Sequence, residues 1–147
     1  MNQRPRRNRN SFNIREMVAE THLKKEDLIY PLFIVDGSQQ KIPIESMPNC
    51  YRWSLDLLIK ELEKCGELGI TNFVLFPVVD NKFKDQKATY SYSSENFYLK
   101  AIEAIKKEFP HFTLMSDVAM DPYSTDGHDG LVINGEINND ESIPILC

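Results

Sequence analysis

The residues of this chain best suited to chemistry lie in an acidic segment between Asp117 and Gly130. Its sequence, DVAMDPYSTDGHDG, places four carboxylates and one imidazole within thirteen residues: Asp117, Asp121, Asp126, His128 and Asp129. Such groups can bind a hard cation through oxygen, orient an amine or transfer protons. Aspartate and glycine are equally common in solvated turns, where the carboxylates cap the backbone. The pattern alone therefore fits either a functional site or an ordinary polar loop.

Several familiar kinds of site are excluded. An EF-hand starting at Asp121 needs Gly at its sixth position and Glu at its twelfth, where this chain has Asp126 and Val132. The sequence contains no glycine-rich phosphate loop, nucleophile elbow or HExxH motif. The scattered cysteines lack metal-ligand spacing, which indicates reduced thiols in a cytoplasmic protein and argues against zinc: Cys50, Cys65 and Cys147.

Three apolar segments are expected to form the strands that position the acidic loop: residues 27–37, 72–79 and 112–120. They are rich in β-branched and aromatic side chains, as buried strands are. Asp117 lies near the end of the third segment. The polar segments at residues 38–53 and 80–94 are expected to be loops, and Asn49 in the first of them suits a left-handed backbone conformation.

Helices are expected between the strands. Apolar spacing predicts a short helix at residues 11–22 and a longer one that begins at an N-cap, Ser54, and ends at Gly66 or Gly69. A further helix is expected at residues 96–109, with three side chains facing the core: Leu99, Ile102 and Ile105. Each of these helices would cover one side of the sheet.

The order β-α-β-α-β predicts an α/β fold with a parallel sheet and helical crossovers. After it, residues 131–137 suggest a hairpin with a type I′ turn at Asn134-Gly135, followed by a helix capped by Asn139 or Asp140. Two architectures fit, an open doubly wound sheet or part of a (β/α)8 barrel. A barrel takes about 200 residues or more, so three strands would be the front portion of a longer protein. In both architectures ligands bind at the carboxyl ends of the strands.

Composition and charge limit the possible partners. The chain is 41% hydrophobic and 27% charged, as soluble domains are, and no apolar run reaches the ~20 residues of a membrane helix. The net charge is −5, yet the first ten residues carry four arginines and no acid: Arg4, Arg6, Arg7 and Arg9. Such a basic arm can bind nucleic acid, contact an acidic neighbour or remain a solvated tail.

Five segments along the chain together resemble porphobilinogen synthase, also called δ-aminolevulinic acid dehydratase: RPRRNR, DLIYPLFIVDG, IPIESMPNCYRWS, LGITNFVLFPV, and DVAMDPYSTDGHDGLV with INGEINNDES after it. The resemblance implies a partial TIM barrel, about the first three βα units, with an N-terminal arm at residues 1–26 and an incomplete barrel domain at residues 27–147. It also implies a cytoplasmic hydro-lyase that condenses two 5-aminolevulinate molecules to porphobilinogen in heme and tetrapyrrole synthesis. The family's arm wraps a neighbouring subunit in a homo-octamer, which explains the arginines better than nucleic acid does.

The resemblance also assigns roles within the acidic loop. Zinc-using members carry three cysteines at the positions that are Ala119, Asp121 and Asp129 here. The replacement resembles the aspartate-rich class, which lacks catalytic zinc and responds to magnesium or a monovalent cation; carboxylates suit such hard cations. Asp117 corresponds to the family's catalytic aspartate, expected to hold the substrate amine. Asp121 and Asp129 would line the second substrate's side through a cation or water.

Two departures from the family pattern concern this chain. Asn49 replaces a glycine in the MPG turn. The two Schiff-base lysines and the glutamate that holds the allosteric magnesium belong to later barrel strands, so the chain alone is expected to be inactive. The lysines present in the loop at residues 80–94 match no family motif: Lys82, Lys84 and Lys87. The alternative hypothesis is a non-catalytic remnant that binds a cation or a partner.

Overall fold

A parallel sheet forms the centre of the computed structural model, which describes residues 6–147. Strand β1 (Tyr30–Val35) pairs with β4 (Asn72–Val78) over its whole length, and β4 pairs with β5 (Thr113–Ser116) from Asn72–Thr113 to Leu75–Ser116. The complete strand order is β2-β3-β1-β4-β5. The predicted α/β class with a parallel sheet is confirmed. None of the helices within residues 6–147 is long and apolar enough to cross a membrane.

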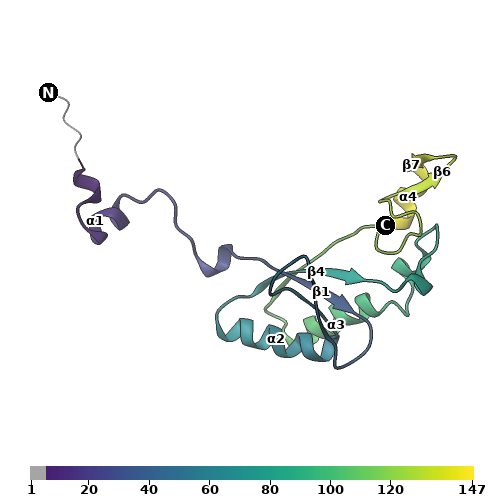
Figure 1. Ribbon diagram of the computed structural model, residues 1–147, viewed down its shortest axis with the longest axis horizontal. Coiled ribbons are helices and arrows are strands. Elements are labelled where there is room, and N and C mark those ends of the chain that lie inside the picture. Colours follow the sequence, from purple (N-terminus) through teal and green to yellow (C-terminus); the bar gives the residue numbers. More distant parts are fainter. Residues whose placement is uncertain (1–5) are drawn as a thin grey trace.

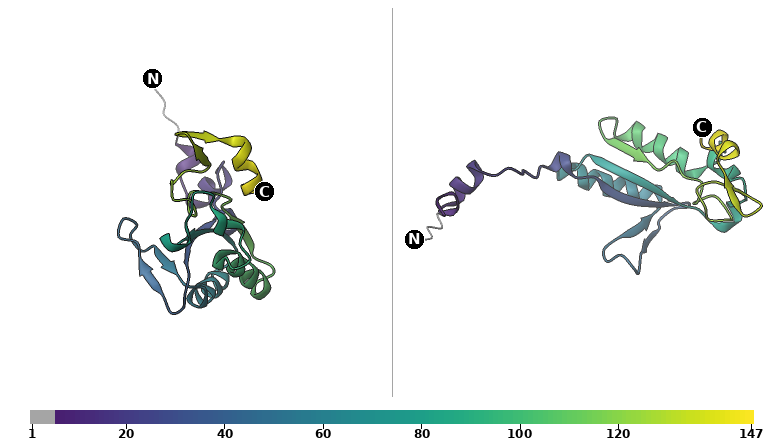
Figure 2. Two further views of the ribbon diagram at one scale, coloured as in Figure 1. Left: turned by 90° about the vertical axis from the view of Figure 1, so that its right-hand side faces the viewer. Right: turned by 90° about the horizontal axis from the view of Figure 1, so that it is seen from above.

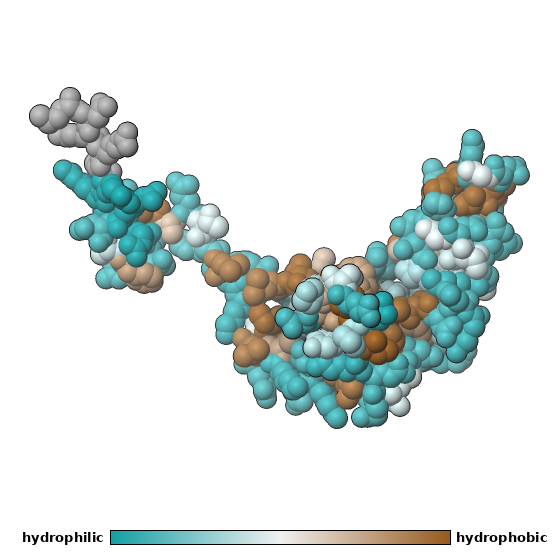
Figure 3. Space-filling view, in the orientation of Figure 1, coloured by the Kyte–Doolittle hydropathy of each residue, from teal (hydrophilic) through white to brown (hydrophobic). Residues whose placement is uncertain are grey.

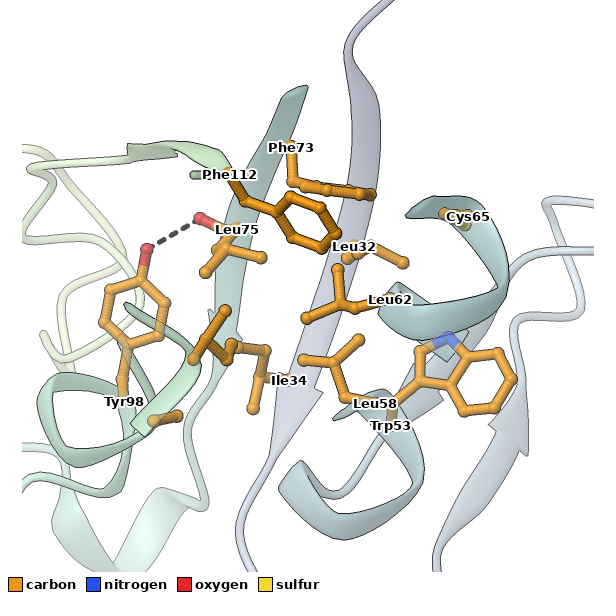
Figure 4. Close-up of a cluster of buried hydrophobic side chains, with 12 residues drawn as sticks. Leu32, Ile34, Trp53, Leu58, Leu62, Cys65, Phe73, Leu75, Tyr98 and Phe112 are labelled. Carbon is orange, nitrogen blue, oxygen red and sulfur yellow. Dashed lines mark hydrogen bonds between the residues drawn. The ribbon is translucent and has the colours of Figure 1, made fainter. Parts of the chain in front are cut away.

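Two helices, α2 (Leu55–Glu67) and α3 (Phe97–Glu108), cover one face of this sheet (Figures 1 and 2). Alternate strand residues point toward them and are fully buried, among them Leu32, Ile34, Phe73 and Leu75. These side chains meet the apolar stripe of α2, Leu58, Leu62 and Cys65, in the core drawn in Figure 4. The period-2 alternation of the strands and the helical spacing of α2 together produce this layer.

The opposite face of the sheet is only half covered. Phe33 and Phe76 lie side by side on it with ring centroids 5.5 Å apart, and both remain partly exposed. Val35 and Val78 continue this face toward the carboxyl ends of the strands. An apolar sheet face of this kind is typical of strands that are buried on both sides in α/β proteins.

The prediction that residues 38–53 form a loop is wrong, because this segment contains two short strands, β2 (Lys41–Pro43) and β3 (Tyr51–Trp53). They pair antiparallel with each other, and β3 also pairs in parallel with β1. The Lys41 ammonium lies 4.2 Å from the Tyr51 ring centroid and 4.5 Å from that of Trp53, a contact that stabilises the pair. Asn49 has φ 64°, as expected of an asparagine in that turn.

Three further expectations need correction. The third strand ends at Ser116 instead of residue 120, because the next ladder acceptor, the Leu75 carbonyl, is taken by the Tyr98 hydroxyl. Leu99 is 45% exposed, since the buried stripe of α3 is shifted to Tyr98, Ala101 and Ile105. The helix expected at residues 11–22 shortens to α1 (Phe12–Met17), since its apolar side chains find nothing to pack against.

Helix caps follow the expected residue types with small shifts. Ser54 stands at the N-cap position of α2 but is buried and binds Gln40 instead of the helix backbone. Gly69, with φ 83°, follows the end of α2 as expected. Helix α4 (Asn139–Leu146) is capped by Asn138, one residue before the predicted cap. The predicted type I′ turn joins β6 (Leu131–Ile133) to β7 (Glu136–Asn138), because φ is positive at both Asn134 and Gly135.

The two ends of the described chain project from the sheet in different directions (Figure 1). Residues 6–29 hold only α1 and two 3-10 turns, Arg7–Arg9 and Lys25–Asp27, and none of them is buried. Two further 3-10 turns, Asn81–Phe83 and Thr89–Tyr92, lie between β4 and α3. Figure 3 shows apolar surface on the arm and at the hairpin end, which matches the exposure of Leu23 and Ile137. Arg4 lies outside the described residues.

Candidate active site

A cleft of about 350 Å³ lies at the carboxyl ends of the parallel strands, on the face opposite α2 and α3. It contains the aromatic pair Phe33 and Phe76. Its charged residues come from two loops and one short strand: Asp117, Asp121, Lys84 and Arg52. The cleft therefore combines apolar walls with convergent charges of both signs, as small-molecule sites do.

Asp117 is positioned by β5, since it is the first residue after that strand. Side chains alternate between the faces of a strand. Ser116 pairs with Leu75, which faces the helices, so the next side chain points to the cleft face. Asp117 is exposed and lines the cleft. The predicted catalytic aspartate therefore stands at the edge of the sheet where α/β proteins bind ligands.

Asp129 is brought back to the start of the acidic loop by hydrogen bonds. Its Oδ1 accepts from the backbone N–H of Met120 at 2.9 Å and from that of Asp121 at 3.2 Å. These charge-assisted bonds close a loop between residues 120 and 129. Asp129 and Asp121, eight positions apart in the sequence, consequently lie next to each other.

Asp129 and Asp117 both act on the carboxyl group of Asp121. Burial raises the pKa of Asp121, and the negative charge of Asp129, a hydrogen bond to its carboxyl group and the charge of Asp117 raise it further. The nearby Lys84 ammonium acts in the opposite direction. Carboxylates held together in this way favour a shared proton, a bound cation or an ammonium group between them. The loop thus gathers Asp117, Asp121 and Asp129, whereas a solvated turn would let them separate.

Two residues of the cleft were not predicted as site residues. Lys84 belongs to a polar loop that suggested no function, and Arg52 was expected in another loop. The structure fixes the loop of Lys84 against the acidic loop by a bridge between Asp85 and Ser124, with Asp85 N–H donating to Tyr123 O at 3.2 Å and Thr125 N–H to Asp85 O at 3.1 Å. No local sequence signal marks this contact, because it joins segments about forty positions apart.

Three residues of the acidic constellation do not line the cleft: Asp126, His128 and Asp129. Asp126 and His128 are exposed, and neither lines it. The Asp126 N–H is bonded to the Ser124 hydroxyl at 3.1 Å, which is an ordinary turn contact. Asp126 and His128 therefore fit the solvated-loop interpretation, whereas Asp117 and Asp121 line the cleft and Asp129 accepts a hydrogen bond from the Asp121 amide.

The donor set does not fit zinc. Ala119 offers no ligand, and the thiols of Cys50, Cys65 and Cys147 belong to a turn, a helix and the end of the described chain. Within residues 6–147 no group of three or more His, Cys, Asp or Glu side chains is arranged to hold a metal ion. The carboxylates of Asp121 and Asp129 fit a hard cation that takes its remaining ligands from water or a substrate.

Comparison with known proteins agrees with this architecture. The sequence model of the family described as delta-aminolevulinic acid dehydratase matches residues 2–147. The delta-aminolevulinic acid dehydratase of Chlamydia pneumoniae is 47% identical over 99% of this chain and 44% of its own length. That of Bradyrhizobium diazoefficiens is 42% identical over 97% of this chain and 40% of its own length.

A solved structure is also closely similar. The enzyme of Toxoplasma gondii ME49, delta-aminolevulinic acid dehydratase (porphobilinogen synthase) in complex with the reaction product porphobilinogen, superposes with a TM-score of 0.93 at 43% identity. The match covers all of this chain and 42% of that one, so the chain spans about two fifths of the length of these relatives. By its sequence and by its fold, this chain belongs to the delta-aminolevulinic acid dehydratase family.

Proposed function

We propose that this chain supplies the first part of a porphobilinogen synthase active site, in which two 5-aminolevulinate molecules condense to porphobilinogen. The observation that carries the proposal is the cleft itself, where Asp117 follows the last parallel strand and meets Asp121, whose backbone amide donates to Asp129. The product complex of the Toxoplasma gondii relative supports it, since that protein shares this fold throughout the chain.

The sheet is proposed to be the first three βα units of a (β/α)8 barrel, preceded by the arm of residues 1–26. The half-covered apolar face that carries Phe33 and Phe76 supports this, because such a face is filled by side chains inside a barrel. The exposed apolar side chains of the arm, such as Phe12 and Leu23, support a role in contacting another subunit of a homo-octamer.

Asp117 is proposed to bind the ammonium group of 5-aminolevulinate and to act as the catalytic carboxylate of this part of the site. Asp121 and Asp129 would face the second substrate molecule and hold a hard cation, magnesium or a monovalent ion, in place of zinc. The raised pKa of Asp121 supports this pairing, because a cation between the carboxylates would relieve their repulsion. The allosteric magnesium would take its main ligand from outside these 147 residues.

The covalent step is proposed to need lysines that residues 1–147 do not provide. Lys84 is the one lysine among the residues that line this cleft. Its side chain lies near Asp121, where it opposes the rise in the pKa of that carboxyl, and it matches no motif of the family's Schiff-base lysines. The 147-residue chain on its own should therefore bind 5-aminolevulinate without converting it.

The experiment is a titration of the purified chain with 5-aminolevulinate by calorimetry, combined with a colorimetric assay for porphobilinogen. Wild type should bind, Asp117→Asn should weaken binding at least tenfold, as expected for loss of a charged hydrogen bond, and no product should form. Asp126→Asn is the matched control, since it removes the same charge from the same loop outside the cleft.

Three outcomes would count against the proposal. Formation of porphobilinogen by the chain alone would show that no further lysines are needed. Equal binding by both variants would remove Asp117 from the site. Binding of magnesium without any binding of 5-aminolevulinate would favour the alternative, a non-catalytic cation-binding remnant.

A further inference from the structure

The buried phenol of Tyr98 contacts the sheet where the pairing of β4 with β5 ends. It lies in the first turn of α3 and is only 3% exposed. Its hydroxyl donates to the backbone carbonyl of Leu75 in β4 at 2.7 Å, the bond drawn in Figure 4. A buried hydroxyl needs such a partner, yet a phenylalanine would fill the same space without one. The hydroxyl is therefore the feature that requires an explanation.

The Leu75 carbonyl is also the acceptor that the next hydrogen bond between β4 and β5 would use. Leu75 pairs with Ser116, the last residue of β5, and Figure 4 shows the bond leaving β4 on the side away from β1. In a parallel ladder the amide after Ser116, that of Asp117, would donate to the Leu75 carbonyl. The Tyr98 hydroxyl occupies that carbonyl instead, so the ladder stops one residue before Asp117.

Asp117 itself lies close to the phenol. Burial raises the pKa of Tyr98 to about 12; the Asp117 backbone amide, as a hydrogen-bond donor to the phenolic oxygen, opposes this rise, and the Asp117 carboxylate adds to it. The hydroxyl thus stands between the Leu75 carbonyl and the Asp117 amide. A second cleft of about 370 Å³ behind this point is lined by both Tyr98 and Asp117.

The phenol cannot move freely, because a buried amide fixes the start of α3. Asn96 is fully buried, its Oδ1 accepts from the Tyr98 N–H at 2.9 Å, and its Nδ2 donates to the Tyr123 hydroxyl at 3.2 Å. Tyr123 belongs to the acidic loop and is itself buried. This network connects the start of α3 to the loop that carries Asp121. It therefore fixes the position of the Tyr98 hydroxyl relative to β4.

We infer that Tyr98 is a positioning residue, whose hydroxyl takes the Leu75 carbonyl in place of the Asp117 amide and thereby directs the Asp117 carboxylate into the cleft. Without the hydroxyl, the remaining ring still keeps the strand ends apart, and both the Leu75 carbonyl and the Asp117 amide lose a partner. The consequence for substrate binding rests on the function proposed above, whereas the consequence for the Asp117 amide does not.

The test compares Tyr98→Phe with Tyr92→Phe in the 147-residue chain. Tyr92 lines the same second cleft but is 58% exposed, so its hydroxyl can be satisfied by water. Residue-resolved hydrogen–deuterium exchange should show about tenfold faster exchange of the Asp117 amide in Tyr98→Phe, as expected for loss of one hydrogen bond, and no change in Tyr92→Phe. The amide of Phe73 in the core should remain equally slow in both variants, which shows that they fold.

The second measurement is the affinity for 5-aminolevulinate, which should fall about tenfold in Tyr98→Phe alone if one charged contact is misdirected. Unchanged exchange at Asp117 would overturn the inference, and so would faster exchange together with wild-type affinity. If the wild-type chain does not bind 5-aminolevulinate, the proposed function fails, and the exchange rate of the Asp117 amide still decides whether Tyr98 holds that residue.

Discussion

Replacement of Asp129 separates its structural role from its electrostatic one. In Asp129→Ala the backbone amides of Met120 and Asp121 both lose their acceptor. Hydrogen bonds to charged groups contribute about 1.5–3 kcal/mol each. Asp129 is exposed, so water replaces part of this interaction. We therefore assign about 1.5 kcal/mol to the two hydrogen bonds together. The loop should therefore open about tenfold more often, since 1.4 kcal/mol corresponds to a factor of ten.

Asp129→Asn is the informative comparison, because it keeps an oxygen acceptor and removes the charge. It should leave the exchange of the Met120 amide within about threefold of wild type, which corresponds to well under 1 kcal/mol. It should also lower the pKa of Asp121, since the Asp129 charge is one cause of the rise. Both variants keep the fold, as neither removes a buried side chain.

The assay is hydrogen–deuterium exchange at Met120 and Asp121, with NMR titration of the Asp121 carboxyl in the Asn variant. Asp126→Asn again serves as the control for charge in the same loop. If Asp129→Ala leaves both amides as protected as in wild type, Asp129 does not anchor the loop. An unchanged Asp121 pKa in Asp129→Asn would show that the two carboxyls do not interact.

Three further predictions concern the fold. Ser54→Ala should lower the free energy of unfolding in urea by about 1–3 kcal/mol, because the Gln40 amide loses its acceptor, the Ser54 hydroxyl at 2.9 Å. Ser46→Ala, at an exposed site, is the control and should have little effect. Burial raises the pKa of Tyr98 to about 12, so the folded state holds its proton longer than the unfolded state. The stability linked to this proton is complete below pH 10 and falls by up to about 3 kcal/mol as the pH approaches 12. The fall should be smaller in Tyr98→Phe, in which Tyr30 and Tyr123 keep their raised pKa values. Met115→Lys on the edge strand β5 should reduce self-association measured by sedimentation, while Leu68→Lys, at an exposed leucine just after α2, should not. Equal effects of the two substitutions would show that the edge of the sheet is not the contact.

The sequence was sufficient for the elements whose residues share one periodicity. The apolar runs that form β1 and β4 and the amphipathic helix α2 lie where the sequence predicts them. The strands β2 and β3 could not be predicted in the same way, since each has three residues. They exist because they pair with each other and with β1, and such pairing is not a local property.

The acidic loop shows the same division. The sequence by itself placed four carboxylates suited to a cation or an amine near a strand end, and its resemblance to a known family pointed to three of them: Asp117, Asp121 and Asp129. Only the tertiary structure decided which of them meet. Asp129 returns to Asp121 through two backbone amides, Lys84 joins them through the bridge between Asp85 and Ser124, and Tyr98 stops the ladder before Asp117. The last two contacts join segments distant in sequence, and their hydrogen bonds form only after the fold has brought those segments together.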